Sequence, residues 1–308
     1  MNHRSLHQFL AACLAIGLAG IPLQAPAQAA PKPVTDALVS AAPGNDRASM
    51  QTMQIPSHGS LMNALVYVAA GAGPHPVVIL LHGFPGNERN LDLAQDIRRA
   101  GWDVLYFNYR GSWGTPGKFS FAHGIEDTAA AIAYLRQPEV AKTLRLDPQR
   151  IVLIGHSMGG FMTVEAAAAD PAIKAFATLS AADMAGHMQQ LVRKDGQAQA
   201  IKDMASGLGN EGMAPLSGCT PDGLARELAA HASHWSFPSS VSTLKDRTAL
   251  IITSDDGLAP ANQTFAADLR QAGDTRVTTV HLPTDHAYSD QRLELSRTVL
   301  AWLAALPK

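Results

Sequence analysis

Segments typical of strands and segments typical of helices alternate along most of this chain, and this alternation restricts the possible fold more than any other feature. Continuous apolar runs such as PVVILL (76–81) and RIVLIG (150–155) are typical of strands covered on both faces. Segments with helical spacing, such as 124–137 and 261–273, lie between such runs. The alternation predicts an α/β domain with a mostly parallel central sheet and helices on both faces.

Composition is consistent with one sizeable globular domain. The 308 residues are 46% hydrophobic and 16% charged, and no segment of 20–50 residues recurs. The formal charge is −2 and there is no long run of Lys and Arg, which argues against nucleic acid as a partner. We expect a small-molecule partner, and the sequence does not indicate an oligomeric state.

The first 29 residues have the pattern of a secretory signal peptide. Arg4 precedes an apolar run over 9–23, which is too short for a comfortable membrane span. Ala27 and Ala29 then supply the small residues of a cleavage site, so the mature chain should begin near Ala30. These features predict export to the periplasm or the medium, without stable membrane insertion.

One alternative for the N-terminus is a lipoprotein. The segment Leu10–Cys13 resembles a bacterial lipobox, which would leave a lipid-anchored Cys13. If the signal peptide is removed instead, Cys219 is the only remaining thiol and no intramolecular disulfide can form. Residues 30–49 then form a flexible leader, rich in Ala, Pro and Ser, before a domain that covers 50–308.

A long insertion interrupts the alternation after the sixth predicted strand. Residues 184–234 contain Met-rich, Gly-rich and amphipathic pieces where one short helix would suffice. Long insertions at the carboxyl end of a strand in an α/β fold are usually functional. We interpret this segment as a cap over a substrate pocket.

The motif GHSMGG places one serine in a turn between a buried strand and a helix. A nucleophile elbow requires this layout, because Ser157 must adopt strained backbone angles where strand and helix cross. Gly155 and Gly159 remove the side chains that would clash there. The following helix points its N-terminal amides at the site, which favours developing negative charge. Ser157 is therefore the candidate nucleophile.

A serine nucleophile needs a base and an acid that orients the base, in the chain order Ser, Asp or Glu, His. Asp255 and Asp256 follow the strand predicted at 248–254. His286 lies in the loop after the next strand, whereas His281 falls within that strand. His286 is the candidate base, and the two aspartates are both candidates for the acid.

Residues from about 50 to 306 resemble the α/β-hydrolase superfamily through the segments LLHGFPG, NYRGSWGTPG, GHSMGG, SDDGLAP and TDHAYSD. The resemblance implies the α/β-hydrolase fold. It favours Asp256 as the acid, because family members commonly place the acid four residues before a proline, here Pro260. Two backbone N–H groups normally stabilise the oxyanion in such enzymes. Met158 supplies one by its position after the nucleophile, and the resemblance implies Phe84 for the other.

The loop at 110–121 also resembles a loop near the pocket in some branches of this superfamily. Trp113 and Phe119 are therefore candidate pocket residues, although packing in the core would explain them equally well. His231 and His234 lack a carboxylate or a third ligand nearby, so we expect no metal. No phosphate-binding motif is present, and we expect no cofactor.

These observations support an exported serine hydrolase that cleaves a carboxylic ester through an acyl-enzyme. One alternative is a small serine peptidase, of aminopeptidase or dipeptidyl type, with the same triad. Another is a degenerate hydrolase that only binds its ligand, although all three triad positions hold competent residues.

Overall fold

The computed structural model describes residues 46–307, which belong to one compact unit. The signal peptide predicted at 1–29 and most of the leader predicted at 30–49 lie outside these residues. Within the described range, no helix combines the length and the apolar character needed to cross a bilayer.

A mixed sheet forms the centre of the fold, with the strand order β1-β2-β4-β3-β5-β6-β7-β8. β2 pairs antiparallel with β1 and with β4, and every other neighbouring pair is parallel. The strands are β1 (Ser49–Ser57), β2 (Ser60–Val68), β3 (His75–Leu81), β4 (Asp103–Phe107), β5 (Leu146–His156), β6 (Ala175–Leu179), β7 (Thr248–Thr253) and β8 (Val277–His281).

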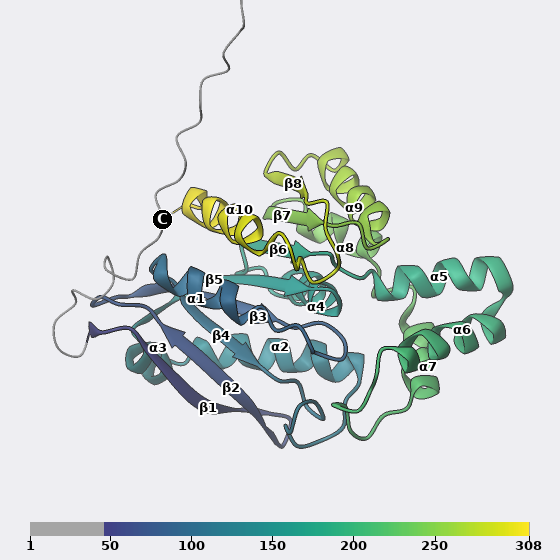
Figure 1. Ribbon diagram of the computed structural model, residues 1–308, viewed down its shortest axis with the longest axis horizontal. Coiled ribbons are helices and arrows are strands. Elements are labelled where there is room, and N and C mark those ends of the chain that lie inside the picture. Colours follow the sequence, from purple (N-terminus) through teal and green to yellow (C-terminus); the bar gives the residue numbers. More distant parts are fainter. Residues whose placement is uncertain (1–45, 308) are drawn as a thin grey trace, which may run out of the picture. The chain divides into compact units, whose positions relative to one another are not determined.

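Helices cover both faces of this sheet (Figure 1). One face packs against α1 and α10, and the other against α2, α3, α4, α8 and α9. The helices are α1 (Leu91–Arg99), α2 (Phe121–Leu135), α3 (Pro138–Leu144), α4 (Met158–Ala169), α5 (Met184–Asp195), α6 (Gln197–Asn210), α7 (Pro221–His231), α8 (Phe237–Leu244), α9 (Ala259–Gln271) and α10 (Arg292–Ala305). The predicted fold class, a mostly parallel sheet between two layers of helices, is confirmed.

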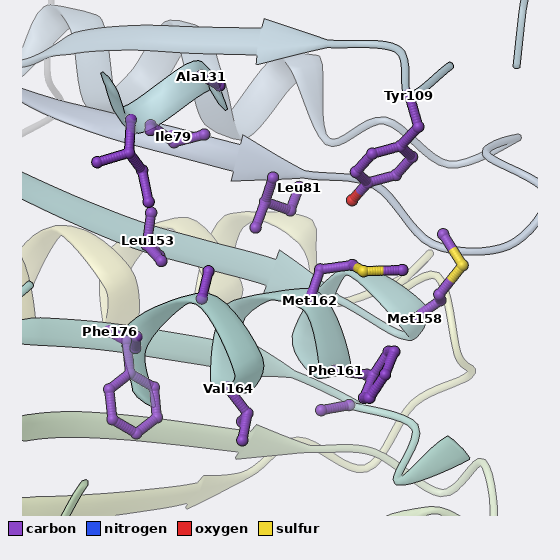
Figure 2. Close-up of a cluster of buried hydrophobic side chains, with 14 of the residues drawn as sticks. Ile79, Leu81, Tyr109, Ala131, Leu153, Met158, Phe161, Met162, Val164 and Phe176 are labelled. Atoms are coloured by element: carbon purple, nitrogen blue, oxygen red, sulfur yellow. The ribbon is translucent and has the colours of Figure 1, made fainter. Parts of the chain in front are cut away.

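The apolar runs of the central strands explain this layering. Successive side chains of a strand point to opposite faces. In β3, Val77 and Ile79 therefore join one core cluster, whereas Val78 and Leu80 join the other. Figure 2 shows part of the first cluster, in which Phe161 and other side chains of α4 pack beside the central strands.

The chain between β6 and β7 forms four helices, α5 to α8. α5, α6 and α7 contact one another and lie beyond the carboxyl ends of the central strands (Figure 1). The segment predicted as a cap, 184–234, contains these three helices, and we call them the cap helices. They bury apolar side chains of the first core cluster, including Ile201, Met204 and Leu224.

Two partly buried carboxyl groups, Asp183 and Glu165, lie where α4 meets the base of the cap. Asp183 caps α5 by accepting a hydrogen bond from the N–H of Gly186 (3.0 Å), and it also accepts one from the N–H of Phe237 at the start of α8 (3.2 Å). Burial raises the pKa of Asp183. Glu165 of α4 has no hydrogen-bond partner for Oε1 among the described residues. Burial, followed by the charge of Asp183, raises the pKa of Glu165 to about 8. Glu165 is therefore protonated in the folded protein at neutral pH.

Because Glu165 keeps its proton when folded and loses it when unfolded, the free energy of unfolding should fall as the pH rises from about 4.5 to 8. One such proton allows a slope of at most about 1.4 kcal/mol per pH unit. Glu165→Gln removes this proton, so its stability should depend less on pH. Urea denaturation of both proteins at several pH values measures the difference.

Asp103 serves as an internal reference in this experiment, because burial raises its pKa to about 7 in both proteins. Its contribution to the slope cancels when the variant is compared with the wild type. A difference in stability between the two proteins that is constant from pH 5 to pH 8 would contradict the assignment to Glu165.

Candidate active site

Ser157 occupies a sharp turn between β5 and α4, with a φ of 58° and a ψ of −122°. Non-glycine residues rarely adopt such a conformation, and it persists only where neighbouring structure imposes it. Backbone hydrogen bonds supply that constraint. The Ser157 N–H donates to the carbonyl of Leu179 (2.9 Å), and the Ser157 carbonyl accepts from Gly160 (2.9 Å) and Ala182 (3.0 Å). The strained turn holds the Ser157 hydroxyl at the carboxyl edge of the sheet.

The glycines around Ser157 are needed because three backbone segments meet there. A Cβ atom on Gly155 would lie 2.0 Å from the carbonyl oxygen of Gly159. A Cβ atom on Gly159 would lie 2.1 Å from the carbonyl oxygen of Leu81, at the end of β3. Any side chain at either position would push strand and helix apart, so the G-x-S-x-G pattern follows from this packing.

The loop after β3 lies directly against the serine. A Cβ atom on Gly83 would lie 2.8 Å from the Cβ atom of Ser157. The next residue, Phe84, and the first residue of α4, Met158, each have a backbone N–H without a hydrogen-bond acceptor among the described residues. The N–H of Met158 also lies at a helix N-terminus, which carries partial positive charge. The two predicted oxyanion donors are therefore free to bind a ligand.

The adjacent aspartates pair with different histidines. The Nδ1 atom of His286 lies 2.7 Å from Oδ2 of Asp256, whose side chain is 5% exposed. Asp255 is 63% exposed and lies 3.1 Å from Nε2 of His281, whose Nδ1 contacts the hydroxyl of Thr253 at 3.0 Å. Only Asp256 contacts His286.

The surroundings of Asp256 keep it ionised. Burial alone would raise the pKa of Asp256, but the hydrogen bonds from His286 (2.7 Å) and from the Leu258 N–H (2.9 Å) lower it to about 2. An ionised carboxylate can only accept hydrogen bonds, so the Nδ1–H of His286 donates to Asp256 and Nε2 is the ring nitrogen that does not face the acid.

His156, the residue before Ser157, links the elbow to the His286 loop. Its Nε2–H donates to the carbonyl of His286 at 2.8 Å, and the centres of the two rings are 4.6 Å apart. Burial, followed by the charge of His286, lowers the pKa of His156 to about 4, so this ring is neutral. The elbow motif contains His156 but does not reveal this contact, because the partner lies 130 positions further along the chain.

The two candidate pocket residues differ in their surroundings. Phe119 is 2% exposed and packs on Phe84 (5.9 Å between ring centres) and Phe121 (5.9 Å), so it belongs to the core behind the loop after β3. Trp113 is half-buried; its Nε1–H donates to the carbonyl of Pro85 at 2.8 Å, and the guanidinium of Arg89 lies 4.1 Å from the ring centre. Trp113 therefore holds the loop after β3 through its hydrogen bond to Pro85, on the side of that loop nearer to solvent.

Backbone hydrogen bonds join the loop at 110–119 to the segment between α6 and α7. Trp113 donates to Pro215 (2.9 Å), Phe119 donates to Ser217 (2.9 Å), and Ser217 donates to Gly111 (2.8 Å). In addition, the Glu227 carboxylate of α7 accepts two N–H groups from the first turn of α2, each at 2.9 Å. The cap helices are thus attached to the sheet domain beside the candidate site.

Other features of the described residues do not add a second reactive centre. A surface pocket of about 260 Å³ between α9 and the strands β7 and β8 includes His281 and Thr253, away from the elbow. His231 stacks on Trp235, with ring centres 3.9 Å apart. No group of three or more His, Cys, Asp or Glu in residues 46–307 could hold a metal ion.

Comparisons with known proteins agree with this architecture. Residues 76–206 match the family model of the alpha/beta hydrolase fold. An uncharacterized 31.7 kDa protein of Escherichia coli is 37% identical over 113 residues, which cover 35% of this chain and 37% of that protein. The quorum-quenching protein AidA of Acinetobacter baumannii is 30% identical over 124 residues, which cover 38% and 39%. The alignments thus span less than two fifths of these curated relatives.

Solved structures match over most of the chain. An esterase of the fungus Rhizomucor miehei has a TM-score of 0.62 at 20% identity, covering 84% of this chain and 83% of its own. Est1E of Butyrivibrio proteoclasticus has a TM-score of 0.61 at 18% identity, covering 82% and 97%. At these identities the similarity concerns the fold. The chain therefore has the α/β-hydrolase fold, which confirms the predicted fold, and esterases are among the solved structures that share it.

The close approach of Gly83 to Ser157 leads to a test of stability. In Gly83→Ala the new Cβ must displace the backbone of the loop or of the elbow, so we expect a loss of about 1–3 kcal/mol. Gly207→Ala is the matched control, because Gly207 is exposed in α6 with no atom within 4 Å of an added Cβ. The control should gain about 0.5–1 kcal/mol. Urea denaturation measures both, and equal effects in the two variants would refute the contact.

Proposed function

We propose that this protein is a serine hydrolase that cleaves carboxylic esters of small molecules through an acyl-enzyme. The observation that carries the proposal is the pairing of His286 with a buried, ionised Asp256, on a loop that His156 connects to the strained Ser157. The free N–H groups of Phe84 and Met158 beside Ser157 complete the set of groups that acyl transfer requires.

In the proposed first half-reaction, Ser157 Oγ attacks the ester carbonyl while Nε2 of His286 takes the hydroxyl proton. The N–H groups of Phe84 and Met158 stabilise the negative oxygen of the tetrahedral intermediate. Asp256 stabilises the protonated imidazole and holds its ring in place. Collapse of the intermediate breaks the ester C–O bond, and His286 gives its proton to the departing alcohol.

The second half-reaction repeats these steps with water. His286 removes a proton from the water molecule, whose oxygen attacks the acyl-enzyme carbonyl. The second tetrahedral intermediate uses the same two N–H donors. Its collapse releases the carboxylic acid, and His286 returns the proton to Ser157. Net, one ester and one water become an acid and an alcohol, with no cofactor.

Apolar side chains of the loop after β3 and of the cap region favour an uncharged acyl group. Phe84 next to the serine and Met184 at the start of α5 are partly buried apolar residues packed on the core, as are Met213, Leu216 and Trp235 in the segment beyond α5. Apolar surface of this kind binds apolar substrate groups. In support of an ester substrate, one solved structure of Est1E, which has this fold, contains ferulic acid.

We also propose that the protein acts outside the cytoplasm after cleavage near Ala30. The support is the pattern of Arg4, the apolar run over 9–23 and the small residues Ala27 and Ala29. The mass and N-terminal sequence of the mature protein, recovered from periplasm or medium, test this proposal. An intact N-terminus, or a lipid on Cys13, would contradict it.

The activity is tested with p-nitrophenyl esters of increasing acyl length beside aminoacyl p-nitroanilides. We expect turnover of esters, complete loss in Ser157→Ala, and a loss of about 10⁴-fold in kcat for Asp256→Asn. Asp255→Asn is the matched control and should change kcat less than about twofold, because Asp255 pairs with His281.

Three outcomes would contradict the proposal. Turnover of anilides in preference to esters would establish the peptidase alternative. A larger loss in Asp255→Asn than in Asp256→Asn would reassign the acid. Ester turnover that survives Ser157→Ala in a folded protein would exclude Ser157 as the nucleophile.

A further inference from the structure

The carbonyl groups of the two residues next to Phe84 each contact a ring nitrogen of a side chain that the proposed steps do not use. His82 Nδ1 lies 2.8 Å from the carbonyl oxygen of Gly83, and Trp113 Nε1 lies 2.8 Å from the carbonyl oxygen of Pro85. A carbonyl oxygen can only accept a hydrogen bond, so both rings donate an N–H. The loop after β3 is therefore held on both sides of the residue whose N–H is a candidate oxyanion donor.

These two bonds act on the direction of the Phe84 N–H. A peptide group is planar, and the C=O of Gly83 and the N–H of Phe84 point to opposite sides of it. The bond from His82 to the Gly83 carbonyl therefore fixes the peptide group that carries this N–H. The bond from Trp113 to Pro85 fixes the chain on the other side of Phe84.

The two rings approach the same backbone atoms further along this loop. A Cβ atom on Gly86 would lie 2.6 Å from His82 Nδ1 and 2.6 Å from Trp113 Nε1. The guanidinium of Arg89 lies over the other face of the loop contact, 4.1 Å from the centre of the Trp113 ring, and Arg89 Nε donates to the Gly86 carbonyl at 3.4 Å. The loop is thus packed closely between donors, which restricts its movement.

The backbone of Trp113 is itself fixed by the cap segment between α6 and α7. The Trp113 N–H donates to the Pro215 carbonyl at 2.9 Å, and the preceding residue, Ser112, forms an isolated antiparallel bridge with Leu216. Trp113 has a φ of 48°, in the left-handed region that residues with a side chain rarely adopt. Such a conformation persists where the surrounding structure imposes it, and it is concentrated at functional sites. The indole is therefore presented to the loop from a fixed backbone.

His82 holds its place at a cost in stability. Its ring is buried, and burial lowers the pKa of His82 to about 4, so the ring is neutral. Its Nε2 atom has no hydrogen-bond partner among residues 46–307. An unpaired buried acceptor destabilises the folded state, so packing alone would favour an apolar side chain at this position. The bond to Gly83 explains why a histidine is present.

We propose that Trp113 is a positioning residue, whose indole N–H keeps the loop after β3 in the conformation that directs the Phe84 N–H at the oxyanion, together with His82. This inference rests on the proposed function. An oxyanion donor is effective when its direction is fixed before charge develops on the substrate oxygen. Without the indole donor, the Pro85 carbonyl is released, and the Phe84 N–H is directed less well at the tetrahedral intermediate.

Trp113→Phe tests the role of the indole N–H, because it removes this donor and keeps an aromatic ring beside Arg89. Phenylalanine also has a Cβ atom, so the strain at position 113 is the same in the variant. We expect kcat for a p-nitrophenyl ester to fall about tenfold, with KM changed less than about twofold. The loss is smaller than the about 10²–10³-fold loss that follows complete removal of an oxyanion donor. The pH profile of kcat/KM should not move, because Asp256 and His286 are unchanged.

A trifluoromethyl ketone tests the link to the oxyanion. The Ser157 oxygen adds to the ketone carbonyl carbon, the hydroxyl proton passes to His286, and the carbonyl oxygen becomes a stable tetrahedral oxyanion. The affinity for this analogue should fall in Trp113→Phe by about the same factor as kcat/KM. A fall in kcat with unchanged affinity for the ketone would overturn the proposal.

Trp302→Phe is the matched control. The Trp302 ring is buried, and its Nε1 has no hydrogen-bond partner in the described part of the chain. Trp302 lies ten residues, about 15 Å, along α10 from Arg292, the end of this helix that follows the His286 loop. Both kcat and the affinity for the ketone should stay within about twofold of the wild type. A loss equal to that of Trp113→Phe would show a general effect of removing a tryptophan and overturn the proposal.

NMR relaxation measures the mobility of the Phe84 N–H without turnover, which separates this inference from the proposed function. The order parameter of this N–H should lie near the rigid value of about 0.85 in the wild type and in Trp302→Phe, and lower in Trp113→Phe. Such a decrease in a protein without Ser157-dependent turnover would support the positioning role while refuting the hydrolase. Turnover with an unchanged order parameter, kcat and ketone affinity in Trp113→Phe would overturn the positioning role alone.

The wild type alone decides if Trp113→Phe does not fold. An order parameter of the Phe84 N–H near about 0.85 would support the proposal, because the loop is then rigid. A value below about 0.6 is typical of flexible backbone and would overturn it.

Discussion

The close approach of backbone segments around Ser157 is the constraint on which the rest of the structure depends. β5, the start of α4 and the end of β3 meet at Gly155 and Gly159, where added Cβ atoms would lie about 2 Å from backbone atoms. Ser157 adopts its rare conformation because these contacts and its own backbone hydrogen bonds leave no alternative. The same approach brings Gly83 against the serine, which leaves two N–H groups free beside it. Packing alone thus fixes both the position of the Ser157 hydroxyl and the two N–H groups beside it.

Neutral, buried groups surround the ionised Asp256 and its partner His286. Asp256 is ionised because several donors outweigh the cost of its burial. His156, which burial keeps neutral, contacts His286 without adding a positive charge next to the base. The buried hydroxyls of Ser180, Ser254 and Tyr288 bond one another on the neighbouring loops, again without formal charge.

The cap helices depend on the sheet domain for their attachment. The loop at 110–119 provides backbone partners for 215–217, and that loop is itself held by Arg110, whose Nε lies 2.6 Å from the completely buried Asp127. The Glu227 carboxylate, on the cap helix α7, accepts hydrogen bonds from the first turn of α2. Its negative charge stabilises the N-terminus of that helix. The cap is therefore bonded to the loop at 110–119 and to the start of α2, next to the loops that surround Ser157. A structural change in the cap can reach the site only through these few bonds and the packing beside them.

The sequence by itself determined the layers of the fold and the position of the elbow, because both depend on local patterns. Apolar runs, helical spacing and the glycines around Ser157 each involve only a few neighbouring residues, so they can be recognised in the sequence without coordinates. The short helix α3 was not predicted, since seven residues contain too few turns for a periodic pattern. Spacing before Pro260 favoured Asp256, but only the tertiary structure separated the two aspartates, by directing one toward His281 and the other toward His286. The contacts of His156, Ser180 and Tyr288 likewise required coordinates, because their partners lie more than 70 residues away along the chain and meet only when the strands align.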